Sequence, residues 1–247
     1  TGDSGTHEVT DHLSLTLDEG EVVCLVGESG CGKSVTAMSL LGLLGPGGSV
    51  KEGSICYEDR DLLTLSEKEL DQIRGKEISM IFQDPMTSLD PTMTIGKQIM
   101  EGMIWHYKLP KAEAYRKAVS LLREVGITDA EQRMKNYPHQ LSGGMRQRCA
   151  LIRTLAIGPD ILLLDEPFSA LDYQTRLAVS ADIWRIIRQE GKTALLVTHD
   201  ISEAVSMSDR VVVLSRRPAT VKAVFDMGEL RPLSPMQRRE NPAFPRY

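Results

Sequence analysis

The chain has 247 residues, of which 41% are hydrophobic and 26% are charged, which is enough apolar material for one or two globular units. Its net charge of −5 at pH 7 lacks the basic bias that is typical of nucleic-acid-binding proteins. No apolar run approaches the about 18 residues that a membrane-spanning helix needs. The composition therefore argues against a nucleic-acid partner and against a membrane span in this sequence.

The first part of the chain predicts a strand, a turn and a helix. Residues 12–17, "HLSLTL", alternate polar and apolar side chains as a half-buried strand does. Residues 21–26, "EVVCLV", form a second, valine-rich strand that ends at a glycine-rich turn. Helical periodicity follows over residues 33–44, and the "GPGG" at 45–48 interrupts it.

Further along, we expect a strand at "GSICYE" and another at residues 77–82. Between them, Ser66 with Glu69 three residues later is the signature of a capped helix start. Residues 84–157 contain almost no β-branched runs, and helical periodicity recurs within them. We interpret this stretch as a helical insert, with helices over 95–107, 111–125 and from about Met145.

After the insert, strands and helices alternate again. Strands are expected at "ILLLD", "TALLVTH" and "RVVVLS", and helices over 174–189 and 200–207. Near-continuous apolar strands that alternate with helices predict a parallel sheet covered by helices on both faces. The last stretch, "RPLSPMQRRENPAFPRY", is rich in proline and arginine and predicts a loosely ordered tail.

Residues 27–34, "GESGCGKS", match the pattern G-x-x-x-x-G-K-[ST] between a predicted strand and a predicted helix, which is the context of a phosphate-binding loop. Glycines allow backbone N–H groups to surround a phosphate, and the helix N-terminus adds its positive end. A flexible glycine-rich turn is the alternative. We predict a site for the phosphates of a nucleotide and for Mg²⁺, with Lys33 on the β- and γ-phosphates and Ser34 on the metal. Its residues are Gly27, Glu28, Ser29, Gly30, Cys31, Gly32, Lys33 and Ser34.

A second candidate element is "ILLLDEP" at 161–167, an apolar strand that ends in two acidic residues. Buried acids at the end of a strand are costly unless they face an ion or a site. We expect Asp165 to hold Mg²⁺, through water, and Glu166 to polarise the attacking water as a general base.

These residues together resemble the ATP-binding cassette (ABC) ATPases, and the similarity extends over about residues 8–225. The octapeptide "LSGGMRQR" at 141–148 resembles the signature sequence of that family. The resemblance implies an α/β fold of the P-loop NTPase class. Such a fold has a RecA-like core with a parallel sheet, an N-terminal antiparallel β portion and an inserted helical subdomain. The core would comprise residues 1–83 and 158–225, the helical subdomain residues 84–157, and the C-terminal tail residues 226–247.

The resemblance also implies how the signature sequence is used. Two cassettes would pair head to tail, as a homodimer or a heterodimer. The signature residues of one cassette would then cover the γ-phosphate held by the phosphate loop of the other. These residues are Ser142, Gly143 and Gly144.

Three further positions resemble functional positions of the family. Gln83 matches the glutamine that contacts Mg²⁺ or the attacking water, and His199 matches the switch histidine, which reaches the γ-phosphate and Glu166. The sequence "SALD" at 169–172 matches a loop that crosses the dimer interface, in which Asp172 would contact the partner cassette.

One departure concerns the adenine ring. The family usually stacks an aromatic side chain on it, at a position that falls near Ser4, yet no Phe, Tyr or Trp precedes Tyr57. Because such a stack is worth about 0.5–1.5 kcal/mol, we expect ATP affinity to be up to about tenfold weaker unless His7 substitutes.

The two halves of the chain resemble different importers. Residues 20–148 are similar to cassettes for dipeptides, oligopeptides or nickel, whereas residues 155–225 are similar to cassettes for nitrate, sulfonate or taurine. The chain is therefore either a natural mosaic or an artificial chimera, and its cargo is of one of these two types.

Both halves imply the ATP-hydrolysing subunit of a bacterial ABC importer, peripheral to the cytoplasmic face of the inner membrane. Membrane permease subunits would contact the helical insert at "QDPMTSLDP", and a solute-binding protein would be an indirect partner. One alternative is a soluble ABC ATPase without transport, although the long insertions, tandem cassettes or basic arms of that class are not visible. The other is a regulatory half of a heterodimer that hydrolyses ATP weakly. The intact Glu166, His199 and signature argue against it, and the missing aromatic argues weakly for it.

Overall fold

The computed structural model of the chain describes residues 7–83 and 89–247. It divides into two compact units. The first unit comprises residues 1–70 and 194–247, and the second comprises residues 71–193. The domain boundaries predicted at residues 84, 158 and 226 remain predictions.

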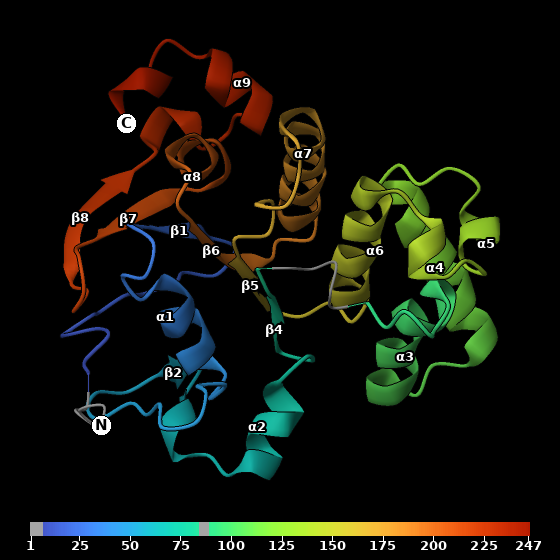
Figure 1. The fold of residues 1–247 in the computed structure, drawn as a ribbon, viewed down its shortest axis with the longest axis horizontal. Helices are drawn as coiled ribbons and strands as arrows, with labels where there is room; N and C mark the ends of the chain where they lie inside the picture. The colour runs from blue at the N-terminus through green and yellow to red at the C-terminus, as the bar shows by residue number, and fades with distance from the viewer. Residues whose placement is uncertain (1–6, 84–88) are drawn as a thin grey trace, which may run out of the picture. The chain divides into compact units, whose positions relative to one another are not determined.

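The first unit is built on strands in the order β6-β1-β7-β8 (Figure 1). β1 runs parallel to β6 and to β7, whereas β8 pairs with β7 in the antiparallel sense. Every residue of β1 and β6 is buried, which explains why both strands read as continuous apolar runs in the sequence. The strands are β1 (Val22–Val26), β6 (Thr193–Thr198), β7 (Arg210–Leu214) and β8 (Val221–Asp226).

The helices that come after the parallel strands β1 and β6 lie where the sequence predicted helices. They are α1 (Lys33–Leu40) and α8 (Ile201–Met207). The predicted extension of α1 to Leu44 is wrong, because the backbone turns after Leu40 and Gly42 adopts a left-handed conformation with φ of 62°. A residue at positive φ ends a helix, and glycine adopts it without steric cost.

The expected strand at residues 12–17 is also absent. Its side chains do alternate between exposed and half-buried, as the sequence pattern predicted. The backbone makes no ladder there, so the alternation reflects an extended segment rather than a strand. The antiparallel β portion of this region is a hairpin of two short strands, β2 (Cys56–Tyr57) and β3 (Arg60–Asp61), followed by the 3₁₀ helix η1 (Leu62–Thr64).

The predicted start of the next helix is confirmed. α2 (Glu67–Ile73) begins directly after Ser66. The backbone N–H and the hydroxyl of Ser66 both donate to the Glu69 carboxylate, at 2.8 and 2.6 Å. Because these hydrogen bonds favour the ionised carboxylate, they lower the pKa of Glu69.

The second unit holds the parallel pair β4 (Ile78–Ile81) and β5 (Ile161–Asp165), with Ile81 opposite Leu164. Its helical part confirms the helices expected in the insert (Figure 1). Met103, Leu122 and Ile152 are completely buried and come from three different helices of this part. The helical elements are α3 (Ile95–Tyr107), α4 (Lys111–Glu124), α5 (Ala130–Arg133), η2 (Pro138–Gln140), α6 (Gly143–Leu155) and α7 (Tyr173–Gln189).

The C-terminal segment, residues 226–247, contradicts the prediction of a loosely ordered tail. It forms η3 (Gly228–Leu230), α9 (Pro235–Glu240) and η4 (Phe244–Arg246). Arg238 has no exposed surface. Its guanidinium donates to the carbonyl oxygens of Leu233 at 3.0 Å, Arg231 at 2.8 Å and Val205 at 3.2 Å, and also to that of Ser208.

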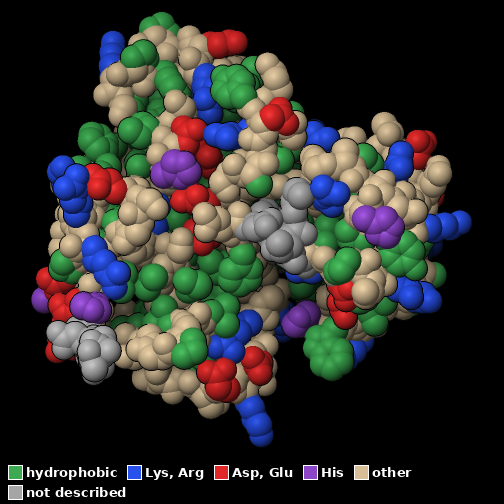
Figure 2. All heavy atoms as spheres, in the orientation of Figure 1, with side chains coloured by type: hydrophobic (Ala, Val, Ile, Leu, Met, Phe, Trp, Pro, Cys, Tyr) green, Lys and Arg blue, Asp and Glu red, His purple; other side chains and the backbone are tan. Residues whose placement is uncertain are grey.

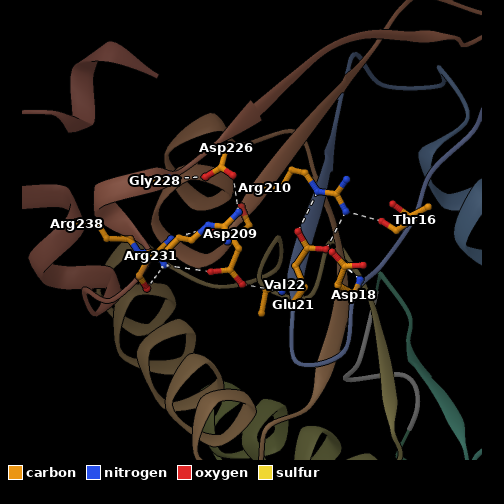
Figure 3. A network of polar contacts seen from close by, with 11 residues as sticks. Thr16, Asp18, Glu21, Val22, Asp209, Arg210, Asp226, Gly228, Arg231 and Arg238 are labelled. Atoms are coloured by element: carbon orange, nitrogen blue, oxygen red, sulfur yellow. Dashed lines mark hydrogen bonds and ion pairs between the residues drawn. The ribbon is translucent and has the colours of Figure 1, made fainter.

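This arginine joins the C-terminal segment to the core of the first unit (Figure 3). Val205 belongs to α8, and Ser208 directly follows that helix. Asp209 lies 4.0 Å from the guanidinium of Arg238 and accepts a hydrogen bond of 2.9 Å from the backbone N–H of Val22, where β1 begins. The proline- and arginine-rich composition was misleading because a buried tertiary contact orders the segment.

Among residues 7–83 and 89–247, no helix combines the length and the apolarity that crossing a bilayer requires. On the face drawn in Figure 2, basic and acidic side chains are interspersed.

Candidate functional site

The phosphate loop lies between β1 and α1, as predicted. A turn closed by a hydrogen bond of 3.2 Å from the N–H of Cys31 to the carbonyl of Glu28 brings Ser29 and Gly30 to the surface. Gly30 and Gly32 have φ of 78° and 122°, which favours glycine at both positions. A Cβ on Gly32 would lie 2.9 Å from the side chain of Val9, so this glycine also allows the N-terminal segment to approach.

The side chain of Lys33 is held by hydrogen bonds to the loop that precedes it. Its Nζ donates to the carbonyl oxygens of Gly27 at 2.7 Å and Glu28 at 3.1 Å, and only 4% of the residue is exposed. An ammonium group has three donors, so a further bond can go to a phosphate oxygen without loss of the first two. Ser34 follows as the second, half-buried residue of α1.

His199 lies at the same edge of the sheet as the phosphate loop. Val26, the last residue of β1, is opposite Thr198, the last residue of β6, and the two strands are parallel. Gly27 and His199 therefore leave neighbouring strands at corresponding points. The hydroxyl of Thr198 accepts from the N–H of Asp200, whose carboxylate accepts from the N–H of Glu203 and caps α8. These bonds fix the turn that carries the exposed His199.

Gln83, Asp165 and Glu166 lie together in the second unit. Because Ile81 is opposite Leu164 in parallel strands, Asp165 at the end of β5 and the residues that follow the two strands lie at one common edge. Asp165 is 5% exposed, so its carboxylate is a buried acid that needs polar partners, as predicted. Glu166 is half-buried and has φ of 44°, which is rare for a residue other than glycine.

The signature residues begin α6. Ser142 is its N-cap, and the Ser142 hydroxyl accepts from the N–H of Met145 at 3.3 Å. Gly143 and Gly144 form the first turn. A Cβ on Gly144 would lie 3.0 Å from the Thr175 side chain, so the signature closely approaches the first turn of α7.

Asp172 is the N-cap of α7. Its carboxylate accepts from the N–H of Thr175 at 3.0 Å. The hydrogen bonds from Thr175 lower the pKa of Asp172 because they stabilise its ionised form. A capping role within the chain therefore accompanies the predicted contact with a partner.

The donor set fits the predicted metal. The hydroxyl of Ser34, the carboxylate of Asp165 and the side-chain carbonyl of Gln83 are all oxygen donors, which Mg²⁺ prefers. Few protein ligands are expected, because Mg²⁺ usually keeps several waters and binds substrate phosphates. Within residues 7–83 and 89–247, no cluster of three or more His, Cys, Asp or Glu residues suggests a different metal.

Comparison with known proteins defines the class. The profile of the ABC transporter family matches residues 10–169 of this chain. The chain therefore belongs to the ABC transporter family and is an ATP-binding cassette.

Its similarity to particular proteins is extensive. The chain is 44% identical over 226 residues to the oligopeptide transport ATP-binding protein AppD of Bacillus subtilis, an alignment that covers 91% of this chain and 69% of that protein. It is 45% identical over 211 residues to the dipeptide transport ATP-binding protein DppD of Bacillus subtilis, covering 85% of this chain and 63% of that protein. The chain thus spans about two thirds of the length of these relatives.

A solved structure confirms the fold class. The structure titled "Dimeric structure of a post-hydrolysis state of the ATP-binding cassette MJ0796 bound to ADP and Pi" superposes with a TM-score of 0.78 at 27% identity, covering 92% of this chain and 94% of that one. The predicted P-loop NTPase class with an ABC helical subdomain is thereby confirmed.

Sequence reasoning missed two features of the site. Val9 packs against Gly32, and Gln147, completely buried in α6, contacts the loop after Asp165. Val9 belongs to no motif, and Gln147 lies in the octapeptide 141–148 at a position to which the sequence analysis assigned no role, so only the fold identifies these two contacts. The position near Ser4, where the adenine-stacking aromatic was expected, lies outside the described residues.

Proposed function

We propose that the chain is the ATP-hydrolysing subunit of a bacterial ABC importer whose cargo is a peptide. The observation that carries this proposal is the placement of the candidate residues at the carboxyl ends of parallel strands. Gly27 and His199 follow β1 and β6, whereas Gln83 and Glu166 follow β4 and β5. Open α/β sheets bind ligands at the carboxyl ends of their strands. The dipeptide and oligopeptide transport relatives support the peptide cargo.

In the proposed reaction, ATP binds with its phosphates on the loop 27–34. Lys33 offsets the charge of the β- and γ-phosphates, and Ser34, Gln83 and Asp165 would hold Mg²⁺, which supplies further positive charge there. Glu166 orients and polarises the attacking water. His199 contacts the γ-phosphate and donates a hydrogen bond to it.

The signature residues act on a second cassette. Ser142 and the first N–H groups of α6 present hydrogen-bond donors at a helix N-terminus, which suits a γ-phosphate. Two copies or two related chains pair head to tail, so each ATP lies between the loop 27–34 of one chain and Ser142–Gly144 of the other. Asp172 contacts the partner cassette.

Coupling to transport requires a membrane partner. The helical insert, residues 84–157, would receive the permease at its edge, "QDPMTSLDP", of which residues 84–88 lie outside the described part of the chain. The domain boundaries predicted from the sequence belong to this proposal. They assign residues 1–83 and 158–225 to the nucleotide-binding core. The chain would act at the cytoplasmic face of the membrane, and a solute-binding protein would deliver the cargo to the permease.

The proposal is tested by steady-state ATPase assays of the chain and of Glu166→Gln. We expect Mg²⁺-dependent hydrolysis in the wild type and loss of turnover by about 10²–10⁴-fold in the variant, the range typical of a general base. On a sizing column, Glu166→Gln should run as a dimer with ATP and Mg²⁺ and as a monomer without ATP. A variant that stays monomeric with ATP would argue against the shared site.

The cargo is tested separately in vesicles that contain the permease. Hydrolysis should rise when peptide-loaded binding protein is added, whereas binding protein loaded with nitrate or sulfonate should have no effect. If only the binding protein loaded with nitrate or sulfonate stimulated hydrolysis, the peptide assignment would be wrong and the ATPase assignment would stand.

A further inference from the structure

The backbone of Glu166 is in an unusual conformation. Its φ of 44° lies in the left-handed region, which a side chain bearing a Cβ rarely adopts. Such strain persists only where the surrounding structure fixes it, and it is common where a functional side chain must be aimed. The neighbours of Glu166 should therefore include groups whose task is to hold this conformation.

Two side chains of the second unit contact the loop at Glu166 and at the residue after it. The Gln147 Nε2 donates to the carbonyl oxygen of Pro167, the residue after Glu166. The Ser169 hydroxyl and backbone N–H lie 3.0 and 3.2 Å from the carbonyl oxygen of Glu166, and the same hydroxyl lies 3.4 Å from that of Gln83. The loop is thus held by one residue of α6 and one of its own residues.

Gln147 is specialised for this contact. The residue has no exposed surface, and its Oε1 accepts no hydrogen bond within the described part of the chain. A buried amide that uses only its donor half is costly, because the unpaired oxygen gains nothing in return for its desolvation. Methionine would fill similar volume at lower cost. The presence of glutamine at position 147 is explained if its hydrogen bond to the Pro167 carbonyl has a role beyond stability.

That use follows from the position of Gln147 in α6. Ser142 is the N-cap of the helix, and Gln147 lies five residues further on, about 7.5 Å along a rigid helical axis. Any displacement of Ser142 as it engages a ligand is therefore transmitted to Gln147 and, through one hydrogen bond, to the loop that carries Glu166.

We propose that Gln147 and Ser169 are positioning residues for Glu166, and that Gln147 links the signature end of α6 to the orientation of the catalytic carboxylate. The inference rests on the proposed ATPase function. Neither residue touches the nucleotide in this account. Both hold the backbone from which Glu166 reaches the attacking water.

The kinetic test uses Gln147→Met, which keeps the side-chain volume and removes the donor. We expect kcat for ATP to fall by about 10- to 100-fold, the scale of an ångström-sized misplacement of a catalytic group. The KM and the affinity for ATP should stay within about twofold, because the binding residues of the phosphate loop are unchanged. Wild-type kcat in a folded Gln147→Met would overturn the proposal.

The matched control is Gln98→Met in α3. Gln98 is also buried, and its Nε2 donates to the carbonyl oxygens of Asp90 at 2.9 Å and Met93 at 3.0 Å. Its loss should lower stability at least as much as that of Gln147 and leave the kcat of the isolated chain within about twofold of wild type. An equal fall in kcat for both variants would mean that Gln147 acts through stability alone.

A double-mutant cycle separates positioning from general damage. In the Glu166→Gln background, where the carboxylate is gone, Gln147→Met should change the residual rate by less than about twofold. A 10-fold or larger further loss in that background would contradict the proposal. Ser169→Ala, at an exposed position that tolerates truncation, should lower kcat with KM unchanged even if Gln147→Met does not fold. A wild-type rate in Ser169→Ala would count against the account.

Hydrogen exchange tests the link without any hydrolysis. The amides of Glu166 and of residues 168–170 should exchange faster in Gln147→Met and Ser169→Ala than in wild type, and at the wild-type rate in Gln98→Met. Unchanged exchange in the first two variants would overturn the positioning role even if the chain proved inactive. An inactive wild type in which those two variants do speed exchange would instead overturn the proposed function alone.

Discussion

The phosphate loop and the C-terminal segment illustrate opposite relations between sequence and structure. The loop at residues 27–34 has its chemistry in contiguous residues, and it lies between β1 and α1 as its motif predicts. The C-terminal segment carries no motif, yet its Arg238 is completely buried among four carbonyl groups. The residues of the loop that would bind a ligand are contiguous in the sequence, whereas the C-terminal segment stabilises the fold through contacts with residues distant in the sequence.

This contrast predicts that substitutions in the two regions change different measured properties. Substitutions in the phosphate loop should reduce nucleotide affinity more than they reduce the free energy of unfolding. Substitutions in the C-terminal segment should reduce the free energy of unfolding and leave the intrinsic affinity of the folded chain for ATP unchanged. Four substitutions test this separation, from the largest expected effect to the smallest.

Arg238→Met should destabilise the chain by about 3–5 kcal/mol, the cost of removing one partner from a buried charged network. The change leaves Asp209 without its cationic neighbour and four carbonyl oxygens without a donor. Urea unfolding monitored by circular dichroism measures the loss. A midpoint equal to that of wild type would show that the segment is not part of the core of the first unit.

Lys33→Ala should weaken ATP binding by about 1.5–3 kcal/mol, or about 10- to 150-fold, because a charged hydrogen-bond donor to the phosphates is lost. Calorimetric titration with ATP and Mg²⁺ measures the affinity, and the same urea experiment serves as the control. The urea midpoint should fall less than that of Arg238→Met, because two carbonyl oxygens lose this donor rather than four. Undiminished affinity would contradict the assignment of Lys33.

Ser234→Ala should cost about 1 kcal/mol of stability, because it removes an N-cap. The Ser234 hydroxyl accepts from the N–H of Gln237, whose side chain accepts in turn from the N–H of Ser234 at 2.9 Å. Thermal unfolding should show a lower midpoint for this variant and the wild-type affinity for ATP. A shift as large as that of Arg238→Met would mean that α9, rather than the buried arginine, holds the segment.

Arg231→Ala should change stability by less than about 1 kcal/mol, since its ion pair with Asp226 at 2.6 Å is largely exposed to water. The small effect should shrink further in 0.5 M salt, because ions screen exposed pairs. A salt-independent loss would indicate that the Arg231 side chain, in addition to its backbone carbonyl, supports Arg238.

The same distinction explains how far the sequence predicted the fold and the site. The buried strands β1, β5 and β6 and the helix start at Ser66 follow from apolar runs and a capping residue, which act locally, whereas α6 begins at Gly143, two residues before the start expected near Met145. The position of His199 beside the phosphate loop follows from the pairing of two parallel strands that no local pattern specifies. Prediction failed at residues 12–17 because alternation does not supply a pairing partner.

The contacts within the site were the least predictable. Gln147 is one polar residue among several in "LSGGMRQR", and only the fold shows that it reaches the carbonyl of Pro167. The strain at Glu166 is likewise invisible in "LLLDEP" and emerges from the backbone alone. Residues with tertiary partners require a structure, whereas residues whose chemistry is local can be recognised from sequence.

The central claim is that each ATP is held by the phosphate loop of one chain and the signature of another. It is tested most directly by mixing two inactive variants, Lys33→Ala and Ser142→Arg, and measuring ATP hydrolysis. In a mixed dimer, the intact loop of the second variant faces the intact signature of the first, so we predict that activity returns on mixing. A mixture that hydrolyses no faster than the sum of its separate components would contradict the shared site.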